Sequence, residues 1–241
     1  MNNENSIVEC FGKSMFCPEL ADVCADIAEE GLDSILTVPA LQGIPIIKSI
    51  NAVVKTAISV KEKYELKKQL VFLQSVSSGV ANPEEIEKRK RAYETGEKWF
   101  YREVENTIVY LSRHARIEKV KIQAILYLDY INGEISEEKY NECLDVLDML
   151  IVGDIPLLME IYEAQSNIID LDTELQEKLK DVKTRFEHTK CGRLNAAGLV
   201  CPVSMGLSFG TFIDNNFVIT DLGRYFCDVV IRLPNKKLSY K

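Results

Sequence analysis

The sequence has few of the residues from which catalytic sites are built. It contains two histidines, His114 and His188, and they lie far apart along the chain. Neither of the glycine-rich phosphate loops, GxGxxG and GxxxxGK, occurs, and there is no Glu-x-x-His pair for a di-metal site. The many carboxylates lie among lysines at helical spacing, as on solvated helix faces. We therefore expect no catalytic residue, no metal site and no cofactor, and we predict that the protein is not an enzyme.

Paired cysteine motifs are also missing. The seven cysteines are odd in number and include no CxxC pair. The first residues, MNNENSIVECFGK, lack the features of a signal peptide. A reducing, cytoplasmic compartment is therefore expected for the resting protein.

Positive charge is scarce. The formal net charge is −8, which argues against broad, nonspecific binding to DNA or to anionic lipid. From Asp170 onward basic residues slightly outnumber acidic ones, so a modest anionic ligand would suit only that part. The cluster KRKR at residues 88–91 is flanked by acidic residues, and we expect it to form a solvated helix face.

What the sequence does contain is a long apolar segment. Between residues 34 and 60 the only charged side chains are Lys48 and Lys55. A continuous helix of that length would be roughly 40 Å long, enough to cross the hydrocarbon core of a bilayer. Prolines and a glycine interrupt its first third. We therefore predict a long apolar helix at about residues 34–76, unbroken from about Pro45.

Five polar residues follow one another along this predicted helix at steps of three or four: Lys48, Asn51, Lys55, Ser59 and Glu62. This spacing places them on one narrow stripe of an otherwise apolar surface. In an assembly of several copies the stripe would line a water-filled pore, and rings of Lys48 and Lys55 would favour anions. The alternative is a central helix that its neighbours bury and whose polar stripe reaches solvent.

The sequence up to residue 165 predicts a bundle of helices. Pro83 is expected to begin a long helix that continues to about Ala115, and Ser136 is expected to cap a later one. We predict a mainly α fold, with a helical bundle at residues 1–165 and a small α+β domain at residues 166–241.

The C-terminal residues have a different pattern. A helix is expected up to Ala197, followed by a Gly-Leu-Val strand, a hairpin, a second strand and a last helix capped by Thr220. RLNAAGLV followed by FVITDLGRYF resembles a winged-helix domain, in which the recognition helix would span about residues 184–197. Its basic residues would contact duplex DNA or the phosphates of a short oligonucleotide or nucleotide: Arg185, Lys190, Arg193 and Arg224. The alternative is a domain used only for packing or oligomerisation.

Most of the chain resembles a family of small bacterial proteins that are often encoded near phage-defence genes. The resemblance rests on GIPIIKSINAVVKTAISVKEKYELKKQLVFL, on EKVKIQAILYLDYINGEISEEKYNECL and on the C-terminal winged helix, in this order. The chain is similar to an effector of the Hailong type, a small helical protein that damages the membrane and is paired with a nucleotidyltransferase. The resemblance implies a homo-oligomer that is cytoplasmic when dormant and acts at the inner membrane when active.

The sequence leaves three functions open. The first is an anti-phage effector that permeabilises the inner membrane through its apolar helix, under the control of an oligonucleotide or nucleotide signal. The second is a cytosolic winged-helix transcription regulator with a helical dimerisation domain. The third is an adaptor that acts through protein contacts alone.

Overall fold

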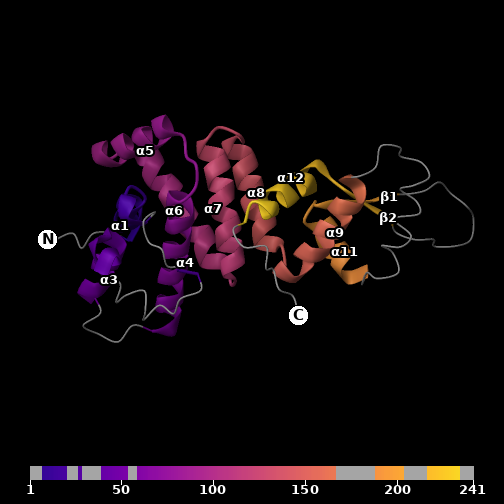
Figure 1. Cartoon of the computed structure of the whole chain (residues 1–241), viewed down its shortest axis with the longest axis horizontal. Helices are drawn as coiled ribbons and strands as arrows, with labels where there is room; N and C mark the ends of the chain where they lie inside the picture. The colour runs from indigo at the N-terminus through magenta and orange to yellow at the C-terminus, as the bar shows by residue number, and fades with distance from the viewer. Residues whose placement is uncertain are drawn as a thin grey trace, which may run out of the picture. The chain divides into compact units, whose positions relative to one another are not determined.

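The computed structural model describes residues 7–20, 27–28, 39–53, 59–166, 188–203 and 216–233. The prediction of a mainly helical fold is confirmed for these residues, which also contain one small antiparallel sheet (Figure 1). Contacts between residues divide the chain into two compact units, 1–144 and 145–241.

The described part of the first unit consists of helices. α4 packs against α6 and α7, and α1 packs against α3 and α6 (Figure 1). Its elements are α1 (Ile7–Ser14), the 3-10 helices η1 (Pro18–Leu20) and η2 (Pro39–Gly43), α3 (Pro45–Val53), α4 (Val60–Ser77), α5 (Pro83–Thr95), α6 (Lys98–Arg113) and α7 (Ile117–Ile131), and α8 (Glu137–Met149) crosses the division.

An aromatic cluster joins three of these helices. The ring centroid of Phe72 on α4 lies 5.6 Å from that of Tyr127 on α7 and 6.0 Å from that of Phe11 on α1. All three side chains are fully buried. Removing a large apolar side chain from water contributes about 1.5–3 kcal/mol. This cluster therefore stabilises the packing of α1 and α7 on α4.

α4 also holds the C-terminal end of α6. Lys68 on α4 is 1% exposed, and its Nζ donates hydrogen bonds to the carbonyl oxygens of Ser112 and His114, both at 3.1 Å. The hydroxyl of Tyr64 donates to the carbonyl oxygen of Ala115 at 3.1 Å. A cation at the end of a helix satisfies carbonyl groups that have no partner inside the helix, and it complements the helix dipole. The N-terminal half of α4 is thereby fixed to α6.

The prediction of one unbroken helix from Pro45 to about residue 76 is wrong. Ser59 lies between α3 and α4 in an extended conformation, with φ −68° and ψ 156°. Its Oγ accepts a hydrogen bond from the backbone N–H of Glu62 at 3.2 Å, and the Glu62 carboxylate accepts one from the N–H of Ser59 at 2.8 Å. This capping box begins a new helix at Val60, because the cap residue itself leaves the helical conformation.

Ser59→Ala is expected to lower the melting temperature of the first unit by about 2–4 °C, because it removes the acceptor for the N–H of Glu62. Thermal unfolding followed by circular dichroism measures this loss. Ser75→Ala is the matched control, since Ser75 lies in the same helix and its hydroxyl only donates back to the carbonyl of Val71. Equal losses in the two variants would contradict a capping role for Ser59.

The long helix predicted from Pro83 to Ala115 is divided at Gly96. Pro83 begins α5 as expected, with the side chain of Asn82 accepting from the N–H of Glu84. Gly96 has a left-handed backbone, φ 74°, and closes α5, so that α6 begins separately at Lys98. The turn allows α5 to pack against α6.

The described part of the second unit combines helices with a two-stranded sheet. β1 and β2 are antiparallel, with Val200 opposite Ile219 and Val203 opposite Asn216. Its elements are η3 (Val152–Asp154), α9 (Ile155–Ser166), α11 (His188–Ala196), β1 (Val200–Val203), β2 (Asn216–Ile219) and α12 (Asp221–Ile231).

α9 belongs to this second unit, so the division falls earlier in the chain than the predicted boundary after residue 165. α9 packs against β2 and α12, and its Gln165 side chain bonds to a donor and an acceptor on one edge of β2. It accepts from the N–H of Ile219 at 2.9 Å and donates to the carbonyl of Phe217 at 3.1 Å.

The turn between β2 and α12 agrees with its sequence pattern. Thr220 caps α12 as predicted, since its Oγ1 accepts from the N–H of Gly223 at 3.0 Å. The same hydroxyl donates to the carbonyl of Gly198 at 2.7 Å. The C-terminal unit is therefore a small α+β arrangement. Residues 204–215, which connect β1 to β2 where the hairpin was predicted, lie outside the described residues.

Candidate functional site

The predicted pore line is not one stripe of one helix. Lys48 is exposed on α3 and Asn51 belongs to the same helix, whereas Ser59 and Glu62 form the capping box of α4. Lys55 lies outside the described residues. The stripe is broken because Ser59 and Glu62 satisfy each other's hydrogen bonds at a helix start. A pore-lining role for the five residues stays a prediction.

The apolar residues before this line are covered in the structure. Leu41, Ile44, Ile46 and Ile47 are fully buried. The Oγ of Ser14, at the end of α1, accepts a hydrogen bond from the backbone N–H of Ile46 at 3.1 Å. α1 therefore holds the first turn of α3. Within the described ranges, no helix combines the length and the apolar character needed to span a bilayer.

The predicted basic ligand site is described only in part. Arg193 forms a two-pronged ion pair with Asp154, in which Nε donates to Oδ2 at 2.7 Å and Nη2 donates to Oδ1 at 2.6 Å. Asp154 is 1% exposed, so this pair fixes α11 to η3. Lys190 is half-buried on α11 and Arg224 is exposed on α12, while Arg185 lies outside the described residues. Their binding role stays a prediction, and Arg193 already has a carboxylate partner.

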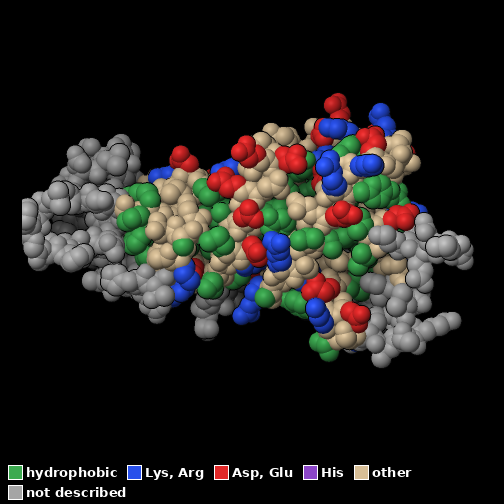
Figure 2. All heavy atoms as spheres, turned by 180° about the vertical axis from the view of Figure 1, so that it is seen from behind, with side chains coloured by type: hydrophobic (Ala, Val, Ile, Leu, Met, Phe, Trp, Pro, Cys, Tyr) green, Lys and Arg blue, Asp and Glu red, His purple; other side chains and the backbone are tan. Residues whose placement is uncertain are grey.

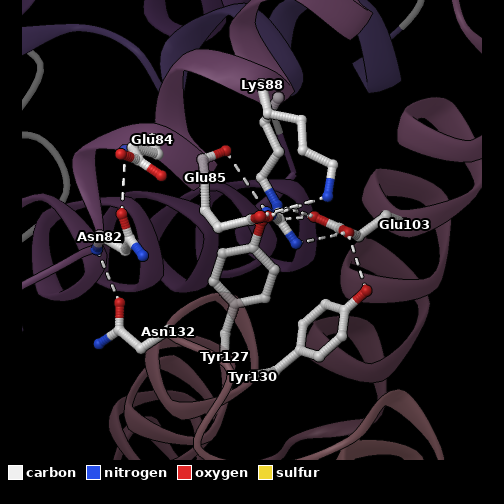
Figure 3. A network of polar contacts seen from close by, with 9 residues as sticks. Asn82, Glu84, Glu85, Lys88, Glu103, Tyr127, Tyr130 and Asn132 are labelled. Carbon is white, nitrogen blue, oxygen red and sulfur yellow. Dashed lines mark hydrogen bonds and ion pairs between the residues drawn. The ribbon is translucent and has the colours of Figure 1, made fainter.

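A polar network in the first unit centres on Arg89 of α5. Arg89 is 3% exposed, and its Nε and Nη2 donate to the two carboxylate oxygens of Glu103 on α6, at 2.9 and 3.2 Å. Its Nη1 donates to the carboxylate of Glu85 at 2.7 Å. Figure 3 shows the carboxylates of Glu85 and Glu103 converging from different helices. A guanidinium group held in this way is strongly oriented, because two of its edges carry charge-assisted hydrogen bonds.

Two tyrosines of α7 complete this network. Tyr127 and Tyr130 donate their hydroxyl protons to the carboxylate of Glu103, at 2.6 and 3.4 Å (Figure 3). Burial and the nearby Glu103 carboxylate raise the pKa of Tyr130 to about 12, and they raise the pKa of Tyr127 well above its ordinary value. Both hydroxyls therefore remain protonated donors at neutral pH. The guanidinium of Arg89 also lies 5.4 Å from the centre of the Tyr130 ring.

A groove of about 550 Å³ opens beside this network. It lies where the first turn of α5, the first turn of α6 and the end of α7 meet. The two cations of its wall are already paired, Lys88 with Glu85 and Arg89 with Glu103. Its two aromatic side chains also have partners, since Trp99 donates a hydrogen bond to Glu97 and Tyr130 stacks on Tyr140. Its lining is Asn82, Glu85, Lys88, Arg89, Trp99, Tyr130, Ile131, Asn132 and Gly133.

Sequence reasoning missed this site. Residues 88–91 were expected to form a solvated face, and Lys88, Lys90 and Arg91 are indeed exposed, but Arg89 is buried. The missing signal was the helical register. Arg89 lies three residues after Ile86 and four before Tyr93, and hence on the apolar stripe of α5.

Comparison of the sequence with protein-family models, and of the chain with curated proteins and solved structures, gives no match. In the part of the chain that the structure describes, no three side chains of His, Cys, Asp or Glu gather as ligands for a metal ion.

Proposed function

We propose that this protein is a bacterial anti-phage effector that oligomerises and permeabilises the inner membrane through residues 34–60, under the control of an oligonucleotide or nucleotide signal. One observation carries the proposal. The charge-poor apolar segment is not part of α4, because the cap at Ser59 begins a new helix. Its large aliphatic side chains between residues 41 and 47 are buried instead, and α3 packs against α1.

The burial of this segment supports a conditional activity. Exposing one large aliphatic side chain to water costs about 1.5–3 kcal/mol, and four such residues, Leu41, Ile44, Ile46 and Ile47, are fully buried. Release into water is therefore strongly unfavourable, whereas the hydrocarbon core of a membrane accepts these side chains without that cost. A signal shifts the balance only if it binds the released state more tightly than the packed state.

The neighbouring helix has attachments of its own. Lys68 and Tyr64 bind α4 to the carbonyl groups at the end of α6, and neither bond involves α3. The capping box at Ser59 begins α4 independently of what precedes it. These contacts support a mechanism in which the apolar segment leaves its site while α4 stays in place.

The second unit is the proposed sensor. Its order of α11, β1, β2 and α12 supports a winged-helix relationship, with Lys190 and Arg224 as candidate phosphate contacts; Arg185, the other candidate, lies outside the described residues. The ion pair with Asp154 occupies the Nε–Nη2 edge of Arg193, so a ligand that binds this edge has to displace Asp154.

Dye release from vesicles of phosphatidylethanolamine and phosphatidylglycerol tests the proposal. Wild-type protein is expected to release dye and to favour anions. Changing Lys48→Glu together with Lys55→Glu is expected to remove that preference, because the charge of the lining is reversed. Ser14→Ala is expected to speed release, since it removes the bond that holds the N–H of Ile46.

The control for charge is Lys90→Glu with Arg91→Glu, which makes the same change on the exposed face of α5. If the wild-type protein leaves the vesicles intact, the membrane function is wrong. The same holds if the variant with Lys48→Glu and Lys55→Glu keeps the preference for anions. Intact vesicles combined with salt-dependent binding to duplex DNA, weakened in Arg224→Glu, would favour the transcription regulator. Acidic and basic side chains are mixed on the described surface in Figure 2, which is a poor match to a polyanion.

A further inference from the structure

The groove beside Arg89 contains a carboxylate that occupies the position of a ligand. The oxygens of Glu85 lie 3.2 and 3.3 Å from Nζ of Lys88, and one of them lies 2.7 Å from Nη1 of Arg89. Hydrogen bonds from these two cations lower the pKa of Glu85 and outweigh the effect of its partial burial, which raises it. A single carboxylate therefore bonds to both cations of the groove wall, and Glu103 supplies Arg89 with a second one.

The two carboxylates around Arg89 are not equivalent. Glu103 is 10% exposed and is bound by Arg89, Tyr127 and Tyr130, so it is fixed on the inner side. Glu85 is 32% exposed and lies in the first turn of α5, where its side chain reaches solvent. The pair of Glu85 with Lys88 is open to solvent and contributes little to stability, whereas Nη1 of the buried Arg89 needs another acceptor when Glu85 leaves. Glu85 can therefore move away while Glu103 keeps the guanidinium oriented.

We propose that this groove binds a small organic anion whose carboxylate or phosphate group replaces Glu85 on Lys88 and on Nη1 of Arg89. Two anionic oxygens recover the hydrogen bonds that Glu85 releases. A volume of about 550 Å³ is within the range of small-molecule sites and leaves room for an organic body beside the anionic group. Trp99 and Tyr130 line the space beside the two cations, where that body would lie. The inference does not depend on the proposed membrane function.

The chain contains a reporter for this site. Trp99 is its single tryptophan, it lines the groove, and Nζ of Lys88 lies 6.0 Å from the centre of its ring. Titration of the full chain with phenyl phosphate is expected to change tryptophan fluorescence in a saturable way. Inorganic phosphate and phenol, each a part of the probe, are expected to bind more weakly than phenyl phosphate. Benzoate distinguishes a carboxylate ligand from a phosphate ligand.

Substitutions of Glu85 and Lys88 are expected to change the affinity for phenyl phosphate in opposite directions. Glu85→Gln removes the competing charge and is expected to tighten binding of phenyl phosphate up to about fivefold, whereas Lys88→Ala is expected to weaken it by at least about fivefold. Lys90→Ala removes an exposed cation from the same helix without touching the groove and is expected to change nothing. Calorimetry on Trp99→Phe checks that the fluorescence change reports binding.

Three results would overturn the proposal. The first is the absence of saturable binding in both wild type and Glu85→Gln. The second is equal weakening by Lys88→Ala and Lys90→Ala, which indicates general attraction to positive charge. The third is that inorganic phosphate binds as tightly as phenyl phosphate, which would mean that the groove does not recognise the organic part of the ligand.

Discussion

Glu103→Ala is expected to lower the free energy of unfolding of the first unit by about 3–5 kcal/mol. The substitution leaves the guanidinium of Arg89 without the carboxylate that binds its Nε and Nη2, although Arg89 stays almost fully buried. It also removes the acceptor for the hydroxyl of Tyr127. Glu85 still binds Nη1 of Arg89, but a buried charge that loses one of its two carboxylates and a buried hydroxyl that loses its acceptor are both costly. Chemical denaturation followed by circular dichroism gives the value.

Glu87→Ala is the matched control, because Glu87 forms an exposed pair with Arg91 at 3.7 Å on the same helix α5. Its expected cost is below about 1 kcal/mol. Replacing both buried partners, Arg89→Met with Glu103→Leu, is expected to cost less than Glu103→Ala alone, since no charge is then left without a partner. If Glu103→Ala and Glu87→Ala cost the same, the network does not stabilise the unit.

Gly223→Ala is expected to destabilise the second unit by about 3 kcal/mol. A Cβ atom at this position would overlap the carbonyl oxygen of Leu199 and would lie 2.7 Å from Cγ1 of Ile219. The oxygen belongs to the backbone and also accepts a hydrogen bond from the N–H of Thr220 at 3.1 Å. The clash therefore separates the start of α12 from the strand pair. Hydrogen exchange of residues 216–231, measured by mass spectrometry, is expected to become faster.

Gly192→Ala is the control for this substitution. Gly192 lies within α11, and a Cβ atom there would meet no other atom within 4 Å. Alanine is the better helix former, so this variant is expected to gain about 0.5–1 kcal/mol. If hydrogen exchange of residues 216–231 is unchanged in Gly223→Ala, the close approach of Gly223 to Leu199 does not stabilise the packing of α12 against β1.

Local signals predicted the ends of several elements. The structure confirms that Pro83 begins α5 and that Thr220 caps α12, and Ser136 binds the N–H of Lys139 at the start of α8. The predicted end of a helix near Ala197 is also confirmed, since α11 ends at Ala196 and Gly198 follows with φ 73°. These predictions succeed because a cap or a left-handed glycine depends on only a few neighbouring residues.

The errors arose where one residue fits two patterns. Ser59 and Glu62 continue the polar stripe of a long helix, but Ser-x-x-Glu is also the pattern of a capping box, and the structure adopts the second. Periodicity alone does not decide between them. Arg89 shows the same ambiguity, because its charge suggests a solvated face while its register places it on the buried stripe.

The candidate groove depends on contacts that sequence cannot supply. Arg89 and Glu103 lie on different helices, and the turn at Gly96 brings them together. The tyrosines that bind Glu103 come from a third helix, α7. Nothing in the local pattern of any one segment indicates that these four side chains meet.

The buried ammonium of Lys68 has a consequence for the order in which the first unit unfolds. Separating α4 from α6 would take two hydrogen-bond acceptors from the Lys68 ammonium and would expose the last carbonyl groups of α6 at the same moment. The two helices therefore open together, as one cooperative unit that includes α7 through Phe72 and Tyr127. α3 takes no part in these bonds and is held instead by α1, through the hydrogen bond between Ile46 and Ser14.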